Sequence, residues 1–418
     1  MDKIKTTVVN SSKYIVSLFK WLIISMVTGF LGGLIGSLFH LSIDFVTELR
    51  EKNVYLLLLL PVGGVVIAGM YKLFSKKGKI DTNRVIESVR EETDIPIIMM
   101  PLIFVSTIIT HFFGGSAGRE GAALQIGGSI GYNLGRIFRL KKSDVHIITM
   151  AGMSAVFAAL FGTPITAAIF SLEVTSVGIF HYAGLFPCII SSIMATFIAS
   201  AFNIRPVHFA NIDFGTVTWN LAIKTIIVAL LCALVSILFC LTLKGTKLLM
   251  GKYLKNAYLR SFTGGAIIVI LTILLGTADY NGAGMDVITK AMSGSAKLEA
   301  PFLKILFTAI TISAGFKGGE IVPSFFIGST FGCAIAPILG IDSSIAAAIG
   351  FIALFCAMVN CPVASIFLSI EVFGIKGLGI FAIASSVSYL MSGCFGLYKS
   401  QKIMYSKIDD EYICANTK

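Results

Sequence analysis

"PLIFVSTIITHFFGGSAGRE", residues 101–120, places glycines and a charged pair directly after an apolar run, and its pattern returns later in the chain. Residues 301–320 read "PFLKILFTAITISAGFKGGE", at an offset of 200 positions. The anchoring matches are Pro101 with Pro301, Gly118 with Gly318, and Glu120 with Glu320. Self-similarity of this kind indicates an internal structural repeat, so its extent determines how we divide the chain.

Two further blocks repeat in the same order. Residues 152–174 align with 350–372 at an offset of 198, and 83–90 (NRVIESVR) align more weakly with 285–292 (MDVITKAM). The pattern therefore predicts two structural halves. The expected segments are a cytoplasmic N-terminal segment at 1–13, a first membrane repeat at 14–203, an external loop at 204–216, a second membrane repeat at 217–398 and a cytoplasmic C-terminal tail at 399–418.

The composition indicates an all-α polytopic membrane protein. Hydrophobic residues make up 56% of the 418 residues and charged residues only 13%, with a mean hydropathy of +0.88. Soluble domains carry roughly 25% charged residues, and about 20 apolar residues span a bilayer as a helix. Apolar stretches of that length follow one another along this chain, whereas a membrane barrel shows short alternating segments.

The net charge of +11 is concentrated between the apolar stretches, at 3–20, 72–79 and 244–260. Cytoplasmic loops of membrane proteins carry such an excess of Lys and Arg. We therefore expect the N-terminus, the 76–80 loop, the 244–260 loop and the tail inside, and no nucleic-acid partner. The predicted location is the cell membrane, crossed many times.

The glycine-rich breaks at 114–121 and 315–319 lie at matching positions of the two repeats. Transporter repeats often run with inverted topology, and their discontinuous helices meet at a substrate site near the midplane. The apolar segments 121–137 and 321–338 read as helices that start just after each break. Because helix N-termini present unpaired N–H groups and a partial positive charge, two of them facing each other predict an anion site.

Glu120 is the first candidate for a working side chain at this site. An acidic residue within a membrane segment is a functional candidate by default, and adjacent helical residues such as Arg119 do not face it. Partial burial would let Glu120 hold a proton near neutral pH. Glu320 has two interpretations, a second carboxylate in the ion path or a helix N-terminal cap.

Three motifs in this order resemble the CLC family of anion channels and proton-coupled antiporters: "GREG" (118–121), "GGEIVP" (318–323) and the tyrosine of "GLYKS". The resemblance covers roughly 15–405 and implies a homodimer in the lipid bilayer with a separate anion path in each subunit. It implies that Glu120 is the gating and proton-transfer carboxylate. It places the anion-binding positions at Gly118, Arg119, Gly121, Gly319, Ile321, Val322 and Tyr398.

Departures from the usual family pattern indicate which branch of the family the chain resembles. The family's serine motif should fall near 79–84, where this chain reads "KIDTNR", so Thr82 and Asn83 are the candidate substitutes. Val174 stands where chloride–proton antiporters often have an internal proton-relay glutamate. With Glu320 in "GGE", these features resemble the bacterial fluoride-exporting clade. A threonine is frequent there at the position of Val322, so the match is incomplete.

Four further groups of residues have plainer interpretations than a role in transport. Glu173 and Glu371 recur symmetrically near the ends of helices, which favours structural caps or ion pairs over transport roles. His111, on an apolar helix, is expected to be a hydrogen-bonded core residue rather than a proton carrier. Tyr398 is either a pore residue or an interfacial belt tyrosine. Phe325 and Phe326 are expected to face lipid or to pack rather than to line the pore, with one ring left as an alternative lining of the fluoride path.

The leading hypothesis is fluoride/proton antiport that exports fluoride, since a small, strongly hydrated anion needs dense hydrogen-bond donors. A chloride/proton antiporter or a chloride channel of the same fold is the alternative. A membrane enzyme would need a nucleophile–base pair or a metal cluster, and the spacing of His, Cys and Asp offers neither. The sequence predicts no cofactor and no metal site.

Overall fold

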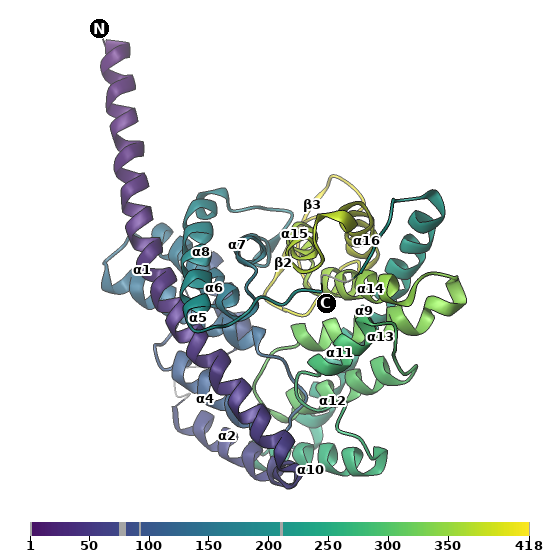
Figure 1. Cartoon of the computed structure of the whole chain (residues 1–418). Coiled ribbons are helices and arrows are strands. Elements are labelled where there is room, and N and C mark those ends of the chain that lie inside the picture. The colour runs from purple at the N-terminus through teal and green to yellow at the C-terminus, as the bar shows by residue number, and fades with distance from the viewer. Residues whose placement is uncertain (1, 75–80, 92, 210–211, 418) are drawn as a thin grey trace.

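The computed structural model describes residues 2–74, 81–91, 93–209 and 212–417, so the 76–80 loop expected in the cytoplasm lies outside the described residues. Within these ranges the chain is mainly helical (Figure 1). The α-helices are α1 (Asp2–Lys52), α2 (Leu60–Phe74), α3 (Thr82–Arg90), α4 (Met99–Phe112), α5 (Glu120–Ile137), α6 (Lys142–Phe161), α7 (Pro164–Glu173), α8 (Leu185–Ala201), α9 (Trp219–Tyr253), α10 (Ala257–Leu275), α11 (Met285–Met292), α12 (Ala300–Ala314), α13 (Ile321–Leu339), α14 (Ser343–Val359), α15 (Pro362–Phe373) and α16 (Leu378–Met391). Short 3-10 helices lie at η1 (Val54–Leu59), η2 (Tyr182–Gly184) and η3 (Ile375–Gly377).

Several of these helices are suited to a bilayer. Seven segments of the described chain are long and apolar enough to cross a membrane by length and composition. The longest, α1, runs past one side of the molecule, and its N-terminal end extends beyond the other helices (Figure 1). Several helices between these spans are apolar but shorter, as in α4 and α12. Tilted, broken and short helices together confirm the predicted polytopic class.

The sequence repeats fall on equivalent helices. The short helices α3 and α11 precede α4 and α12, and each of those is followed by a break and then by α5 or α13. Further on, Gly162 ends α6 and Asn360 ends α14, both in the left-handed conformation, with φ of 68° and 55°. A proline then starts the next helix in each half, where its missing N–H costs no helical hydrogen bond.

The helices α7 and α15 cap each other. The carboxylate of Glu173, at the end of α7, accepts the Val363 and Ala364 amides at 3.1 and 2.8 Å. In return, the carboxylate of Glu371 in α15 accepts two amides at the start of α7, those of Ile165 and Thr166, at 3.0 and 2.9 Å. Negative charge at a helix N-terminus satisfies orphan donors and the macrodipole, so this pair has the structural role expected from its symmetry.

Replacing Glu371 with alanine is expected to lower the free energy of unfolding by about 1 kcal/mol, because two α7 amides lose their acceptor. Thermal unfolding of the purified protein in detergent measures this as a lower midpoint. Glu299→Ala is the matched control, since Glu299 is exposed and makes no side-chain capping bond at the start of α12. Equal midpoints for the two variants would contradict the capping role of Glu371.

Small residues bring the helices that follow each break into backbone contact with their neighbours. A Cβ on Gly127 of α5 would overlap the carbonyl oxygen of Gly152 in α6, and a Cβ on Gly328 of α13 would overlap that of Gly350 in α14. Such close approach is the usual role of glycine at membrane helix interfaces. The two helix pairs therefore hold the two breaks at fixed positions.

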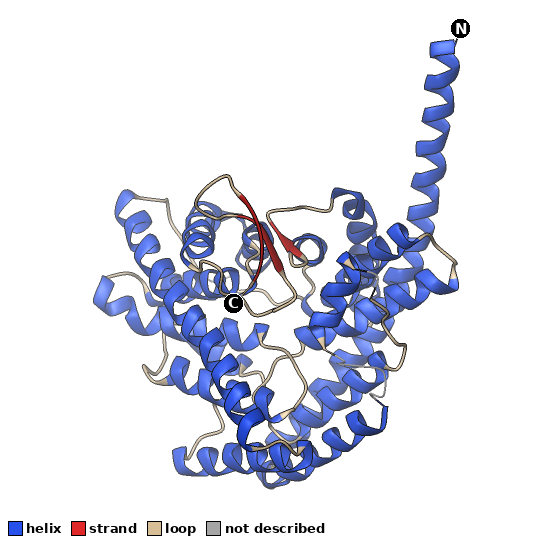
Figure 2. Cartoon of the chain, turned by 180° about the vertical axis from the view of Figure 1, so that it is seen from behind, coloured by secondary structure: helices blue, strands red, loops and turns tan. Residues whose placement is uncertain are grey.

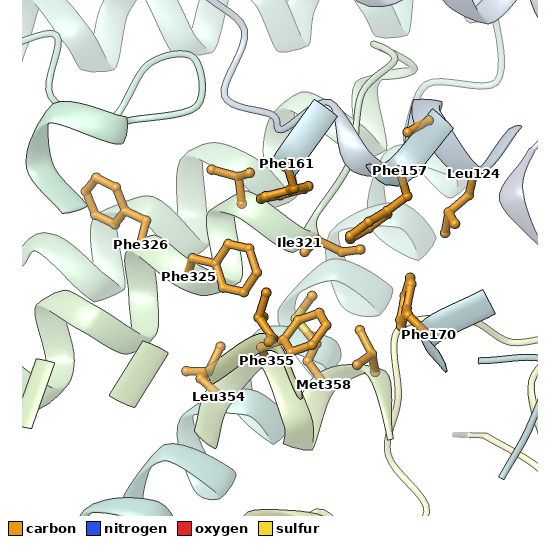
Figure 3. Close-up of a cluster of buried hydrophobic side chains, with 14 of the residues drawn as sticks. Leu124, Phe157, Phe161, Phe170, Ile321, Phe325, Phe326, Leu354, Phe355 and Met358 are labelled. Atoms are coloured by element: carbon orange, nitrogen blue, oxygen red, sulfur yellow. The ribbon is translucent and has the colours of Figure 1, made fainter. Parts of the chain in front are cut away.

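Aromatic side chains fill the space between the two halves. Phe325 stacks on Phe351 with ring centroids 4.0 Å apart and meets Phe161 edge-on. Figure 3 shows Phe325, Phe355 and Phe157 gathered around Ile321, at the start of α13. Phe326 is also fully buried, so both phenylalanines that follow the second break pack inside the protein and neither faces lipid.

A small sheet lies beside the helices and was not predicted. Its strands are β1 (Ser176–Val177), β2 (Lys402–Tyr405) and β3 (Tyr412–Asn416), in the order β1-β2-β3 (Figure 2). β2 pairs in parallel with β1 and antiparallel with β3. The predicted tail at 399–418 thus contains a hairpin that joins the segment after α7 in one sheet.

Candidate functional site

The two glycine-rich breaks meet. The Gly118 N–H donates to the Gly319 carbonyl at 2.6 Å, and the Gly319 N–H donates to the Gly118 carbonyl at 2.7 Å. This isolated antiparallel bridge joins positions 201 residues apart in sequence (319 − 118). It places the starts of α5 and α13 side by side, which is the convergence that the repeat predicts.

The Glu120 carboxylate occupies the space between these two helix starts. Glu120 is the first residue of α5 and is fully buried. Its Oε2 accepts the Arg119 amide at 3.0 Å and the Val322 amide of α13 at 3.4 Å. Its Oε1 is buried without a hydrogen-bond partner among the described residues. The carboxylate therefore takes amide bonds from both breaks and keeps one oxygen unsatisfied.

Arg119 contributes to the site through its backbone. Its guanidinium turns away from Glu120 and pairs with Asp44 of α1 at 3.0 Å. This agrees with the expectation that Arg119 is not the partner of Glu120. The ion pair also anchors the first break to the longest helix, and Asp44 itself contacts His40 at 2.9 Å.

The start of α13 supplies further backbone donors. Ile321 and Val322 are its first two residues and are buried, with the Ile321 side chain in the aromatic cluster of Figure 3. Glu320 precedes them at the N-cap position, yet its side chain makes no capping hydrogen bond. The capping alternative for Glu320 is therefore absent from this structure. Its side chain lines a cavity.

That cavity has a volume of about 960 Å³. Glu320 and Tyr398 line it together with residues of the 244–260 segment. Seven basic and three acidic side chains contribute to its wall: Lys72, Arg84, Lys244, Lys247, Arg260, Lys317 and Lys399 against Asp81, Glu87 and Glu320. Such an excess of positive charge raises the local concentration of anions.

Tyr398 lines the same cavity as Glu320 and is buried in the protein. Its side chain is 3% exposed, which excludes the interfacial belt alternative. Its hydroxyl is buried without a hydrogen-bond partner among the described residues. A buried hydroxyl without a partner is costly, so this group is available to a ligand.

The two candidate substitutes for the missing serine are engaged differently. The Thr82 hydroxyl donates to the Gly121 carbonyl at 3.4 Å and accepts from Gln125 Nε2 at 3.0 Å. Asn83 Oδ1 accepts the Ser400 amide at 3.0 Å, two residues after Tyr398. Both residues line the cavity. Thr82 thus ties α3 to the start of α5, and Asn83 ties α3 to the segment that carries Tyr398.

Gln125 and Asp81 belong to the site and were not predicted. Gln125 is 5% exposed, and its Oε1 has no hydrogen-bond partner among the described residues. Asp81 caps α3 by accepting the Arg84 amide at 3.2 Å and lines the cavity. The sequence held a sign of each residue. Gln125 is a lone amide in the apolar run "AALQIGG", and Asp81 stands directly before a helix, where Asp is a preferred cap.

The His111 side chain contacts the backbone of the first break. It is 1% exposed, and its Nε2 lies 3.3 Å from the Gly118 carbonyl oxygen. The adjacent Arg50 guanidinium donates to the His111 carbonyl at 3.0 Å. These contacts match the expected hydrogen-bonded core histidine.

A buried carboxylate between two helix N-termini, next to a basic cavity in a many-span helical protein, defines a membrane protein that handles anions. Comparison with known proteins identifies the family. A family model described as voltage gated chloride channel matches residues 63–393. The chain belongs to this family, the CLC channels and transporters, as its motifs predict.

Individual relatives include proteins that handle fluoride and chloride. The chain is 34% identical to the chloride/fluoride channel protein of Pseudomonas syringae pv. tomato, over 93% of this chain and 87% of that protein. It is 25% identical to the H(+)/Cl(-) exchange transporter ClcA of Vibrio parahaemolyticus, over 84% and 82%. The crystal structure of a CLC-type fluoride/proton antiporter matches with a TM-score of 0.88 and 31% identity, over 92% and 98%.

Proposed function

We propose that this protein is a fluoride/proton antiporter that exports fluoride from the cytoplasm across the cell membrane. One observation carries the proposal: the Glu120 carboxylate sits between two helix starts and accepts the amides of Arg119 and Val322. Those are donors that a transported anion would use. A carboxylate in an anion site can be displaced by an anion once it is protonated, which couples the two species.

The exchange follows from this competition. While Glu120 is ionised, its Oε2 holds the amides of both breaks and excludes an anion from them. Protonation removes the negative charge, weakens these bonds and frees the amides for an anion that arrives from the basic cavity. The proton is taken up from the external side, and its release to the cytoplasm returns the carboxylate to its place and displaces the anion outward. Each cycle then carries anion and proton in opposite directions.

Fluoride is the proposed anion because of the donors and the relatives. A small, strongly hydrated anion requires closely spaced hydrogen-bond donors to replace its water. We assign these donors to the Arg119 and Val322 amides and to the Tyr398 hydroxyl, which has no partner among the described residues, and the surrounding backbone to Gly118, Gly121, Gly319 and Ile321. The similarity to a solved fluoride/proton antiporter at 31% identity supports this choice.

Glu320 is proposed as a second carboxylate on the ion path. It lies in the cavity wall beside the start of α13, without a capping bond, and is thus free to exchange protons with the cytoplasm. Asn83, which lines the same cavity, is the proposed replacement for the family serine. Thr82 is assigned to positioning because its hydroxyl is bonded within the protein.

We also infer a homodimer with one path in each subunit. Both breaks, the cavity and Tyr398 are contributed by a single chain, so each subunit holds a complete site. The family relationship supports the dimer, and the basic 244–260 segment in the cavity wall supports an orientation in which the cavity opens to the cytoplasm.

The selectivity is tested by efflux from liposomes loaded with equal concentrations of fluoride and chloride, followed with ion-selective electrodes. We expect fluoride to leave at least about tenfold faster, which corresponds to about 1.4 kcal/mol of discrimination. Protein-free liposomes give the leak. Chloride efflux equal to or faster than fluoride efflux would favour the alternative, a chloride/proton antiporter or chloride channel, which the 25% identical exchange transporter also supports.

A further inference from the structure

The chain after Tyr398 folds back onto it. β2 and β3 form a hairpin, and the residue after β3 returns to the start of that hairpin. There the Thr417 hydroxyl donates to the Tyr398 carbonyl at 2.6 Å, and the Thr417 amide donates to the Gln401 carbonyl at 3.2 Å. Thr417 is 6% exposed, so these bonds are shielded from water.

The same short segment is bonded to both halves of the protein. Gln401 Nε2 donates to the Val174 carbonyl at 3.0 Å and to the Val359 carbonyl at 2.8 Å, one from each repeat. The Leu397 amide donates to the Met358 carbonyl at 2.9 Å. The backbone on either side of Tyr398 is therefore held against the ends of α7 and α14.

A second anchor holds the loop of the hairpin. Lys407 Nζ donates to Asn360 Oδ1 at 2.5 Å, to the Tyr389 carbonyl at 2.8 Å and to Ser392 Oγ at 2.8 Å. The ammonium also lies 4.1 Å from the Tyr389 ring centroid. Asn360 Nδ2 in turn donates to the Phe395 carbonyl at 3.0 Å, three residues before Tyr398.

The Tyr398 ring lacks a comparable anchor at its other end. Its hydroxyl has no hydrogen-bond partner among the described residues, so no protein bond at the tip sets the direction of the ring. The place from which the ring enters the cavity is therefore set by the backbone of Tyr398 and not by a hydrogen bond at its tip. Anything that fixes this backbone fixes the donor.

We propose that the 402–417 hairpin positions Tyr398 for anion binding and that Thr417 is the positioning residue at its contact with the pore segment. This inference rests on the proposed function, in which the Tyr398 hydroxyl binds the transported anion. Thr417 acts through the Tyr398 carbonyl and does not touch the anion. The hairpin thereby becomes part of the transport machinery although it lies outside the two breaks.

The test compares Thr417→Val, which keeps the shape and loses the hydroxyl, with Thr417→Ser, which keeps the donor. Fluoride efflux is measured against internal fluoride concentration. Loss of one buried hydrogen bond predicts a half-saturation concentration raised roughly three- to tenfold in T417V, with T417S near wild type. Equal size-exclusion profiles establish that the reconstituted variants are folded alike.

The same pair of changes is then made in a Tyr398→Phe background. If Thr417 acts through the Tyr398 hydroxyl, T417V changes half-saturation in the wild type and has little further effect in Y398F. An equal change in both backgrounds, or no change in either, overturns the positioning role. Should T417V fail to fold, Lys407→Met releases the other anchor, with the same outcomes expected.

Failure of the proposed function gives a different pattern. If Y398F alone transports fluoride like the wild type, the Tyr398 hydroxyl does not bind the transported anion. The role that the proposed function gives to Tyr398 then fails, and the positioning role of Thr417 fails with it. If Y398F is impaired while T417V and K407M transport like the wild type, only the positioning role is overturned.

Discussion

Glu120→Gln is expected to abolish the coupling between fluoride and protons completely. A glutamine has nearly the shape of the glutamate and stays at the start of α5, yet it cannot take up or release a proton. In liposomes with a fluoride gradient, proton uptake should therefore fall to the level of protein-free liposomes, whatever passive fluoride movement remains. A pH electrode and a fluoride electrode in the same chamber measure both fluxes.

Glu299→Gln is the matched control for this change. Glu299 stands at the N-cap of α12, is exposed and makes no side-chain capping bond, so its replacement removes a carboxylate remote from the paired breaks. This variant should couple fluoride and protons like the wild type. Proton uptake that continues in Glu120→Gln at the wild-type ratio to fluoride would show that another group carries the proton.

The second large effect is expected from Gly319→Ala, which tests the meeting of the two breaks. A Cβ at Gly319 would overlap the Gly121 amide nitrogen and lie 3.2 Å from that of Glu120, and backbone cannot move aside as a side chain does. Overpacking of this kind costs about 1–3 kcal/mol. The pair of hydrogen bonds between Gly118 and Gly319 should open, and fluoride efflux should fall at least about tenfold.

Gly245→Ala is the corresponding control, because a Cβ at Gly245 meets no atom within 4 Å. It should leave efflux unchanged. The two variants are compared at equal reconstituted amounts, with size-exclusion profiles as the measure of folding. Gly319→Ala that transports as fast as Gly245→Ala would contradict a site built on the contact between the breaks.

The convergence of the two breaks could be predicted from sequence because a repeat supplies long-range information. Glu120 and Glu320 each follow a glycine-rich interruption at matched positions, and inverted repeats bring matched positions to one axis. The structure adds the detail that Gly118 and Gly319 form a two-bond bridge. The reciprocal caps of Glu173 and Glu371 were predictable for the same reason, since symmetric residues meet symmetric helix starts.

Features without a counterpart in the repeat escaped prediction. β2 and β3 are short, and β2 is held in the sheet by parallel pairing with β1, in which Ser176 lies opposite Lys402, 226 residues later in the sequence (402 − 176). Register of this kind depends on tertiary packing and is weakly encoded in local sequence. The Arg119–Asp44 pair likewise depends on how α1 lies against the first break, which no local pattern specifies.

The replacement of the family's serine shows what comparison of short motifs cannot predict. Motif comparison offered Thr82 and Asn83 because their side chains resemble serine in hydrogen bonding. The residue at the helix start is Asp81, whose side chain caps α3 itself. Asp81, Thr82 and Asn83 all line the cavity, and their different hydrogen bonds depend on the phase of α3, since a shift of one residue turns a side chain by about 100° around the helix axis.

Proton movement by the wild-type protein under a fluoride gradient tests the central claim most directly. Liposomes are loaded with fluoride at equal internal and external pH, and the voltage is clamped at zero with potassium and valinomycin. Fluoride/proton antiport predicts that departing fluoride draws protons inward, so the interior acidifies without any initial proton gradient. Fluoride that leaves at full rate while the internal pH stays constant would contradict the account.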